Sequence, residues 1–400
     1  MKYQDIKKYA QECVESNKEQ YLEYLKTAIR FRTVNPPGNE DTLAEYLRNI
    51  LSEHGIESRL QQVEQGRSNV IGNYSFGNGG KKLLLNSHMD VVAPGEVPWE
   101  TDPFEPVVKD GYLYGRGSSD DKGGLIAMLI ALLIFKEAGI EDVGGTIEFC
   151  GVMGEEASGI GTEFWLKQGG KADAAIVGEP SKLELVIAHR GAYRPQYSFY
   201  GRTAHSSEPS LGENAVYYAA HFVQEIEKLN NELEKTPHSL TGAPTIALTV
   251  INGGKKVNVI PDKATVQIDR RISPGEPLED VKKQIQEILD KMTEEKTIGR
   301  YELDKCLNMK GAGEVKEDET IVQVVKEVLE EAGLPADAKG MRASTDMYML
   351  TDAGIPTVIF APGDMGVAHM PDESINIQQF LDSIPLYVDI FVRYFQNSRL

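Results

Sequence analysis

Six histidine and carboxylate side chains stand at or just after the ends of short apolar segments of this chain. They are His88, Asp120, Glu155, Glu156, Glu179 and His369. In open α/β sheets, binding and catalytic groups gather outside the carboxyl ends of the strands. Two imidazoles with several carboxylates suit a borderline divalent metal such as Zn²⁺. The pattern therefore predicts a metal site at one edge of a sheet.

Each of these residues also has an ordinary structural explanation. His88 could be a structural histidine at a strand end, and Asp120 could cap the helix that follows it. Asp90, however, stands two residues after His88 and offers the kind of carboxylate that often fixes the tautomer of a ligating histidine. Glu155 and Glu156 are neighbours whose side chains point in different directions. One can bind a metal while the other takes a proton from an attacking water.

Length, charge and cysteine content narrow the class of protein. The 400 residues, 41% hydrophobic and 26% charged, are typical of a globular protein with two or three domains. A net charge of −19 disfavours nucleic acid as a partner. Three widely spaced cysteines indicate a reducing compartment. The first residues lack the apolar segment of a signal peptide. The longest apolar run is shorter than the ~20 residues that a membrane-spanning helix needs. We expect a cytoplasmic protein without a membrane partner.

Hydrophobic periodicity predicts alternating helices and strands in the first part of the chain. Helices are expected at about 40–54 and around 125–135, and strands at 57–63, 68–75 and 81–87. From about residue 190 to residue 306 the predicted order is β-α-β-β-α-β, which is ferredoxin-like. This segment holds no candidate metal carboxylate at a strand end. We therefore expect an α/β domain formed by residues 1–187 and 307–400, with residues 188–306 inserted as a compact α+β domain.

The motifs around these residues resemble those of the co-catalytic metallopeptidase and deacylase family of acetylornithine deacetylase, succinyl-diaminopimelate desuccinylase, aminoacylase and glutamate carboxypeptidase. The resemblance extends over essentially the whole chain. Its motifs are NSHMDVV, YGRGSSDDKGG, GEEASGIG, VGEPS, GRTAHSSEP, VNVIPDKA, IDRRISPGE, FAPGD and AHMPDES. It implies a metallopeptidase domain with a mixed, largely parallel sheet flanked by helices, and an inserted ferredoxin-like dimerisation (lid) domain.

The resemblance also implies a role for each matching residue. The metal ligands would be His88, Asp120 and Glu179 for one ion, and Asp120, Glu156 and His369 for the other. Glu155 would be the general base, with Asp90 as a second catalytic residue. The peptide bond between Asp120 and Asp121 would be cis.

The inserted domain would contribute to the site as well. In the family, the residue that matches His205 reaches the active site of the partner subunit and stabilises the tetrahedral oxyanion, although a polar loop histidine is the simpler reading of its spacing. Asn258 and Arg271 match positions that hold the substrate's carboxylate or oxyanion. Gly363 would offer a backbone N–H. The resemblance thus implies a homodimer.

Taken together, the residues predict a hydrolase that uses two divalent metal ions to cleave the amide bond of a small substrate with a free carboxylate. Zn²⁺ is the first choice of metal, with Co²⁺ or Mn²⁺ as alternatives. N-acyl amino acids are the favoured substrates, and a dipeptidase or carboxypeptidase is the alternative because its chemistry is identical. A non-catalytic, metal-stabilised binding protein is the alternative from another class, but it would have no use for Glu155. Departures from the family's commoner residues at Ala361 and Asp372 bear on the substrate pocket.

Overall fold

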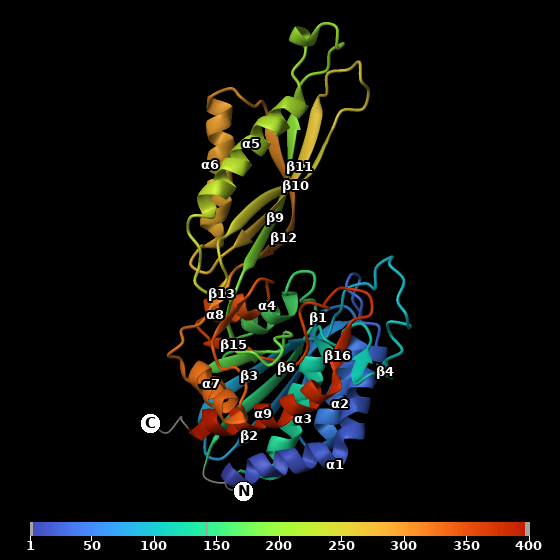
Figure 1. Ribbon diagram of the computed structural model, residues 1–400, viewed down its shortest axis with the longest axis vertical. Helices are drawn as coiled ribbons and strands as arrows, with labels where there is room; N and C mark the ends of the chain where they lie inside the picture. Colours follow the sequence, from blue (N-terminus) through green and yellow to red (C-terminus); the bar gives the residue numbers. More distant parts are fainter. Residues whose placement is uncertain (1–2, 141–142, 397–400) are drawn as a thin grey trace. The chain divides into compact units, whose positions relative to one another are not determined.

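The computed structural model describes residues 3–140 and 143–396, which divide into two compact units (Figure 1). Unit 1 consists of Met1–Ile187, Glu314–Lys339 and Thr345–Leu400, and unit 2 consists of Ala188–Gly313 and Gly340–Ser344. The sequence placed the second boundary after residue 306. In the structure it lies after Gly313, because strand β12 (Tyr301–Lys310) remains paired with β9 of unit 2.

Unit 1 is built on a mixed sheet with the strand order β1-β2-β6-β3-β7-β15-β8-β13, and β14 pairs with β8. The strands are β1 (Glu57–Glu64), β2 (Arg67–Phe76), β3 (Lys81–His88), β6 (Gly145–Val152), β7 (Ala174–Val177), β8 (Val186–His189), β13 (Gly313–Glu314), β14 (Lys339–Met341) and β15 (Thr357–Ile359). The central strands β6, β3, β7 and β15 are parallel. Parallel strands are covered on both faces, which explains the continuous apolar runs. The expected α/β class is confirmed.

Helices cover this sheet, and the most deeply buried of them is α3. The helices of unit 1 are α1 (Tyr3–Arg30), α2 (Asp41–Glu53), α3 (Lys122–Ala138), α4 (Ile160–Lys167), α7 (Thr320–Ala332), α8 (Met347–Asp352) and α9 (Ile377–Gln396). Helix α3 packs on β3 and β6 and also contacts α1 and α9 (Figure 1). Apolar side chains occupy all faces of this helix, as expected for a helix that other elements surround on all sides. Among residues 3–140 and 143–396, no helix has the length and apolarity needed to cross a membrane.

A small antiparallel sheet lies beside the main one. Its strands, in the order β16-β5-β4, are β16 (Ser374–Asn376), β5 (Tyr112–Tyr114) and β4 (Val107–Lys109). Strand β5 leads into the segment with Asp120, and β16 follows the segment with His369. Their pairing joins two parts of the chain that are about 260 residues apart in sequence.

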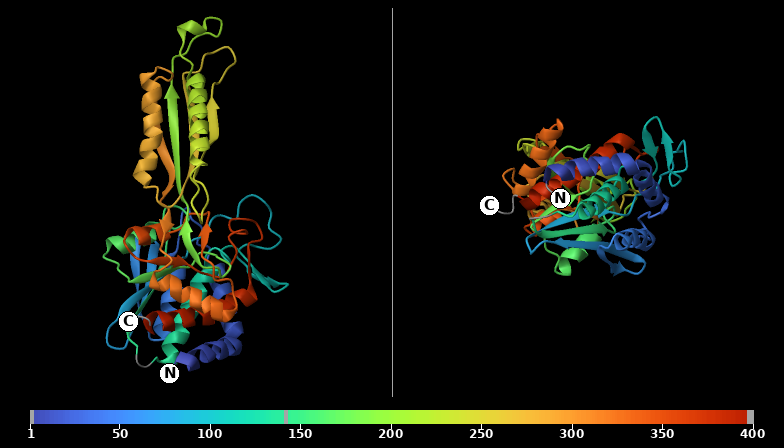
Figure 2. Two further views of the ribbon diagram at one scale, coloured as in Figure 1. Left: turned by 60° about the vertical axis from the view of Figure 1, so that its left-hand side comes forward. Right: turned by 90° about the horizontal axis from the view of Figure 1, so that it is seen from below.

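Unit 2 has the expected β-α-β-β-α-β order. Its elements are β9 (Gly191–Tyr200), the 3₁₀ turn η1 (Pro209–Leu211), α5 (Ala215–Leu233), β10 (Thr245–Gly253), β11 (Lys263–Ile272), α6 (Leu278–Glu294) and β12. The strands form an antiparallel sheet in the order β10-β11-β9-β12. Burial alternates strictly along β11, so one face is covered. Phe199, Phe222 and Ile285 belong to the core between this face and the two helices, which run along the strands in Figure 2.

The aromatic cluster around Phe135 of α3 provides a test of the packing in unit 1. Its ring centroid lies 5.2 Å from that of Phe76 and 5.8 Å from that of Phe391. Phe135→Ala should lower the free energy of unfolding by ~3–5 kcal/mol, because it leaves a cavity in a tightly packed core. Val97→Ala, at a side chain that is largely exposed, should change it by less than ~0.5 kcal/mol. Urea denaturation measures both, and similar values for the two variants would contradict this packing.

Candidate metal centre

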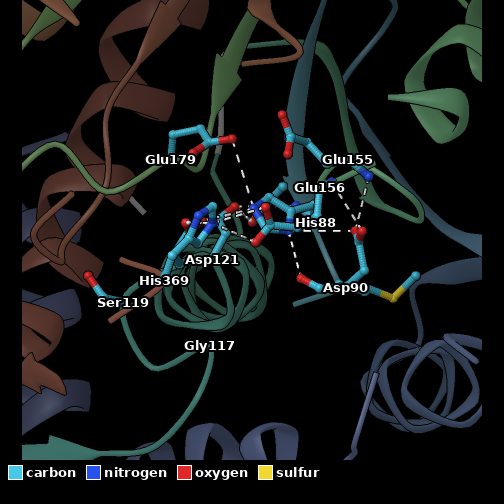
Figure 3. Close-up of polar contacts among 12 residues, drawn as sticks. His88, Asp90, Gly117, Ser119, Asp121, Glu155, Glu156, Glu179 and His369 are labelled. Atoms are coloured by element: carbon cyan, nitrogen blue, oxygen red, sulfur yellow. Dashed lines mark hydrogen bonds and ion pairs between the residues drawn. The ribbon is translucent and has the colours of Figure 1, made fainter. Parts of the chain in front are cut away.

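The carboxyl ends of three adjacent strands bring the predicted residues together. His88 is the last residue of β3, the Glu155–Glu156 pair follows β6, and Glu179 follows β7. Strand β3 lies between β6 and β7 and runs parallel to both. The three strand ends therefore lie at the same edge of the sheet, as expected. Figure 3 shows His88, Glu179 and His369 converging there.

The donor atoms form two groups that share one residue. The donor atoms of His88, Asp120 and Glu179 all lie within 4.8 Å of one another, and the same is true of Asp120, Glu156 and His369. Asp120 Oδ1 is 3.0 Å from His88 Nε2, and Asp120 Oδ2 is 3.3 Å from His369 Nε2. Each oxygen of a single carboxylate thus faces one histidine.

These spacings fit divalent metal ions. In a tetrahedral site with bonds of ~2.1 Å, neighbouring donor atoms lie ~3.4 Å apart. His369 Nε2 is 3.0 Å from Glu156 Oε2, and His88 Nε2 is 3.9 Å from Glu179 Oε1. Imidazole nitrogen with carboxylate oxygen is also a donor set that suits Zn²⁺ and its neighbours in the transition series. The residues present therefore fit a pair of ions that share Asp120.

The charges of the site lead to the same conclusion. Burial raises the pKa of Glu156 to about 7, and the charge of Asp120 adds to this rise. Burial also raises the pKa of Glu179 well above its usual value. Hydrogen bonds to Asp120 and Glu156 raise the pKa of His369 to about 10. Burial opposes protonation of His88, but Asp120 and the other carboxylates raise its pKa well above 6.5. The negative charge of these clustered, buried carboxylates therefore has to be balanced by positive charge, which bound protons or metal ions can supply.

Asp90 has a different role from the one expected. His88 Nδ1 lies 2.8 Å from the backbone carbonyl oxygen of Asp90 and 3.6 Å from its carboxylate, so the carbonyl fixes the tautomer. The Asp90 carboxylate instead accepts from the backbone N–H groups of Glu155 and Glu156, at 3.0 and 3.1 Å. It also accepts from Asn35 Nδ2 at 2.8 Å. Asp90 therefore orients the glutamate pair, and Asn35 is a contact that the sequence did not reveal.

Asp121 supports the strand end that carries His88. It occupies the N-cap position of α3, but its side chain makes no capping hydrogen bond. Its Oδ2 accepts from Ser87 Oγ at 2.5 Å and from the backbone N–H of His88 at 3.2 Å. The bond between Asp120 and Asp121 is cis, as the resemblance implies.

Gly363 lies close to the Asp120 segment, but its backbone N–H is already engaged. It donates to Gln379 Oε1 at 2.9 Å, so a substrate oxygen would have to displace this amide before accepting from it. Gly363 has a φ of +101°, and a Cβ atom there would lie 2.7 Å from Ser119 Oγ. The backbone conformation and the close approach both require glycine at this position.

The remaining predicted residues belong to unit 2, where they fall into two places. His205 forms an isolated antiparallel β-bridge with Val259, and the N–H of Ser206 donates to the carbonyl oxygen of Asn258 at 3.1 Å. The N–H of Ser207 donates to His205 Nδ1 at 3.2 Å, which leaves Nε2 to carry the proton of a neutral imidazole.

Arg271 lies near the far end of β11 from these loops. Its guanidinium Nε is 2.8 Å from Asp269 Oδ1. Eight residues separate it from Lys263, where β11 begins, and at ~3.3 Å per residue this corresponds to ~26 Å. Within one chain, His205 and Arg271 are therefore too far apart to contact the same small molecule.

Known proteins resemble this chain over most of its length. A probable succinyl-diaminopimelate desuccinylase of Staphylococcus epidermidis is 28% identical over 405 residues, covering 94% of this chain and 98% of that protein. N-formyl-4-amino-5-aminomethyl-2-methylpyrimidine deformylase of Bacillus subtilis is 27% identical over 418 residues, covering 97% and 98%. The crystal structure of a tripeptidase from Staphylococcus aureus superposes with a TM-score of 0.79 at 23% identity, covering 94% of this chain and 99% of that one. The model of peptidase family M20/M25/M40 matches residues 84–397. The chain therefore belongs to this peptidase family and is a metal-dependent hydrolase.

Proposed function

We propose that this protein is an amidohydrolase with two divalent metal ions that removes the acyl group from small N-acyl amino acids. The observation that carries the proposal is the position of Asp120, which belongs to both donor groups, while Glu155 belongs to neither. Glu155 is buried at the same edge of the sheet, and its carboxylate points away from Asp90 in Figure 3. A purely structural metal site is closed by its ligands and needs no such additional carboxylate.

The proposed reaction assigns a task to each group. When bound, the two ions would lower the pKa of a water molecule and polarise the amide carbonyl. Glu155 accepts the proton of that water at its carboxylate and returns it to the leaving amine nitrogen. His205 donates from Nε2 to the oxyanion, with Asn258 beside it. Arg271 binds the substrate carboxylate by donating two parallel N–H hydrogen bonds to it.

The substrate class rests on the relatives and on the chemistry of the residues. The names of the curated relatives describe removal of a succinyl or a formyl group, and the tripeptidase favours peptides as the alternative. A panel of N-acetyl and N-succinyl amino acids and dipeptides would separate the two. We expect faster turnover of the acyl amino acids, and a preference for dipeptides would replace this proposal by the exopeptidase. Zn²⁺ is the proposed metal, with Co²⁺ and Mn²⁺ as alternatives.

We further propose a cytoplasmic homodimer in which His205 of each chain serves the site of its partner. The ~26 Å between the two ends of β11 supports this arrangement, because a small substrate can contact both His205 and Arg271 only if they come from different chains. Two-fold pairing is the commonest symmetry of homo-oligomers. Cys13, Cys150 and Cys306 are all free thiols, which is consistent with a reducing compartment.

The two adjacent glutamates should respond differently to removal of their charge. Glu155→Gln should lower kcat by ~10²–10⁴-fold, because it removes the general base, while metal content stays at the wild-type level. Glu156→Gln should instead lower the metal content. Steady-state kinetics and elemental analysis of the same preparations measure both effects. Wild-type turnover in Glu155→Gln would refute the assignment of Glu155 as the base and Glu156 as the ligand.

Metal binding should depend on pH because both histidines carry protons in the metal-free protein. The pKa of His369 is about 10, and a protonated imidazole cannot ligate. Zn²⁺ binding at pH 8 should therefore release protons. The affinity for Zn²⁺ should rise with pH up to about 10, where His369 has lost its proton. Below a pH of about 7 the affinity should decrease more steeply, because Glu156 then gains a proton as well. Calorimetric titration of chelator-treated protein in buffers of different ionisation enthalpy measures this release.

The histidine variants test which group releases the protons. His369→Ala should release fewer protons, whereas His221→Ala, at an exposed position on α5, should behave like the wild type. A heat of binding that does not depend on the buffer would mean that neither predicted histidine is a ligand.

Subunit mixing tests whether His205 acts on the partner's site. Glu155→Gln chains and His205→Ala chains should each be nearly inactive as homodimers. After subunit exchange, hybrid dimers contain one site with an intact Glu155 and an intact His205, so activity should reappear. If exchange is demonstrated by differently tagged chains and no activity returns, His205 acts within its own chain or not at all.

A further inference from the structure

The segment that carries Asp120 is wrapped around a buried carboxylate. The side chain of Glu373 is fully buried. Its Oε1 accepts from the backbone N–H groups of Ser119 and Asp120, both at 2.9 Å. Its Oε2 accepts from the N–H of Gly117 at 3.1 Å and from Arg116 Nη1 at 2.6 Å. Four donors from one short segment thus converge on a single side chain.

This arrangement is rigid for an electrostatic reason. A carboxylate is strongly destabilised by burial unless its charge and its lone pairs are satisfied. Here a guanidinium balances the charge, and backbone N–H groups from one turn form an anion-binding nest around the remaining lone pairs. The guanidinium of Arg116 is itself held over the ring of Trp99, 5.0 Å from its centroid. The segment therefore cannot move without leaving a buried charge or buried amides unpaired.

Glu373 also fastens the second segment that contributes to the site. Its carbonyl oxygen accepts from the N–H of Gly115 at 2.9 Å, and the next residue, Ser374, pairs with Tyr114 in the small sheet. His369 lies four residues earlier on the same segment, and its side chain is 53% exposed. One residue thus ties the exposed segment of His369 to the buried segment of Asp120.

We propose that Glu373 is a positioning residue of the metal centre, which fixes the backbone of Asp120 so that each of its carboxylate oxygens faces one histidine. This inference rests on the proposed role of Asp120 as the ligand shared by two ions. Such a ligand has little freedom, because metal sites require their donor atoms to be placed to within ~0.5 Å. Loss of the acceptor for the Asp120 N–H would allow a shift of that size, and it would affect both ions together.

The test is metal binding to the full-length protein after chelation, with Co²⁺ as the probe. In Glu373→Gln, the amide keeps one acceptor oxygen for Arg116 but turns its NH₂ group towards the N–H groups of Ser119 and Asp120. We expect ~10–100-fold weaker Co²⁺ binding, as is typical when a group that orients a ligand is lost. Both ions should be affected, and the visible absorption spectrum of the Co²⁺ protein should change.

Glu148→Gln is the matched control. Glu148 is a buried carboxylate on β6 that accepts from Lys82 Nζ at 2.8 Å and from Trp165 Nε1 at 2.7 Å. It contacts no residue of the metal centre in these hydrogen bonds. This variant should lose thermal stability and keep the wild-type Co²⁺ affinity and spectrum.

The outcomes separate this inference from the proposed function. If the wild-type protein binds fewer than two Co²⁺ ions, the proposed function fails. If it binds two and Glu373→Gln binds them with the same affinity and spectrum, Glu373 only stabilises the fold and the inference is overturned. If Glu373→Gln does not fold, Glu373→Asp decides, since it keeps the charge but is too short to reach all four donors. Wild-type Co²⁺ binding by Glu373→Asp would equally overturn the inference.

Discussion

The carboxylate of Asp120 is the contact on which the rest of the site depends. Its two oxygens face two histidines that come from distant parts of the chain, at 3.0 and 3.3 Å. No regular element carries Asp120, so its position has to be imposed by its surroundings. Strand β3 supplies His88 from one side, the small sheet brings the segment of His369 from the other, and Glu373 holds the backbone between them.

Around this contact, the structure separates the predicted metal ligands from the groups that orient them. Asp90, Asp121 and Glu373 are buried acids, and each accepts hydrogen bonds from backbone N–H groups of the segments that carry the predicted ligands. Backbone N–H donors are fixed in direction, so an acid that binds them is fixed as well. Acidic side chains thus serve two purposes here, as predicted metal ligands and as acceptors that orient the backbone. The partner of each carboxylate decides which purpose it serves.

Much of this could be predicted from sequence. The apolar runs of β3, β6 and β7 predicted buried strands, and the polar residues after them predicted the edge at which His88, Glu156 and Glu179 meet. Asn35 and Glu373 could not be predicted. The partner of Asn35 is a carboxylate 55 residues away in sequence, and the partners of Glu373 are mostly backbone amides about 253 residues away. No local pattern therefore distinguishes these two residues from solvent-exposed polar residues. The acceptor of His88 Nδ1 was wrongly expected to be the Asp90 side chain, because a sequence pattern can indicate the residue but not which of its oxygens faces the imidazole.

The two histidines of the donor groups differ sharply in their access to water, whereas Glu156 and Glu179 are equally buried, each with a side chain that is 6% exposed. The side chains of His88 and Glu179 are 2% and 6% exposed, whereas that of His369 is 53% exposed. An ion held by Glu156 and His369 would therefore exchange with the surrounding solution faster than its neighbour, which is enclosed between strand ends.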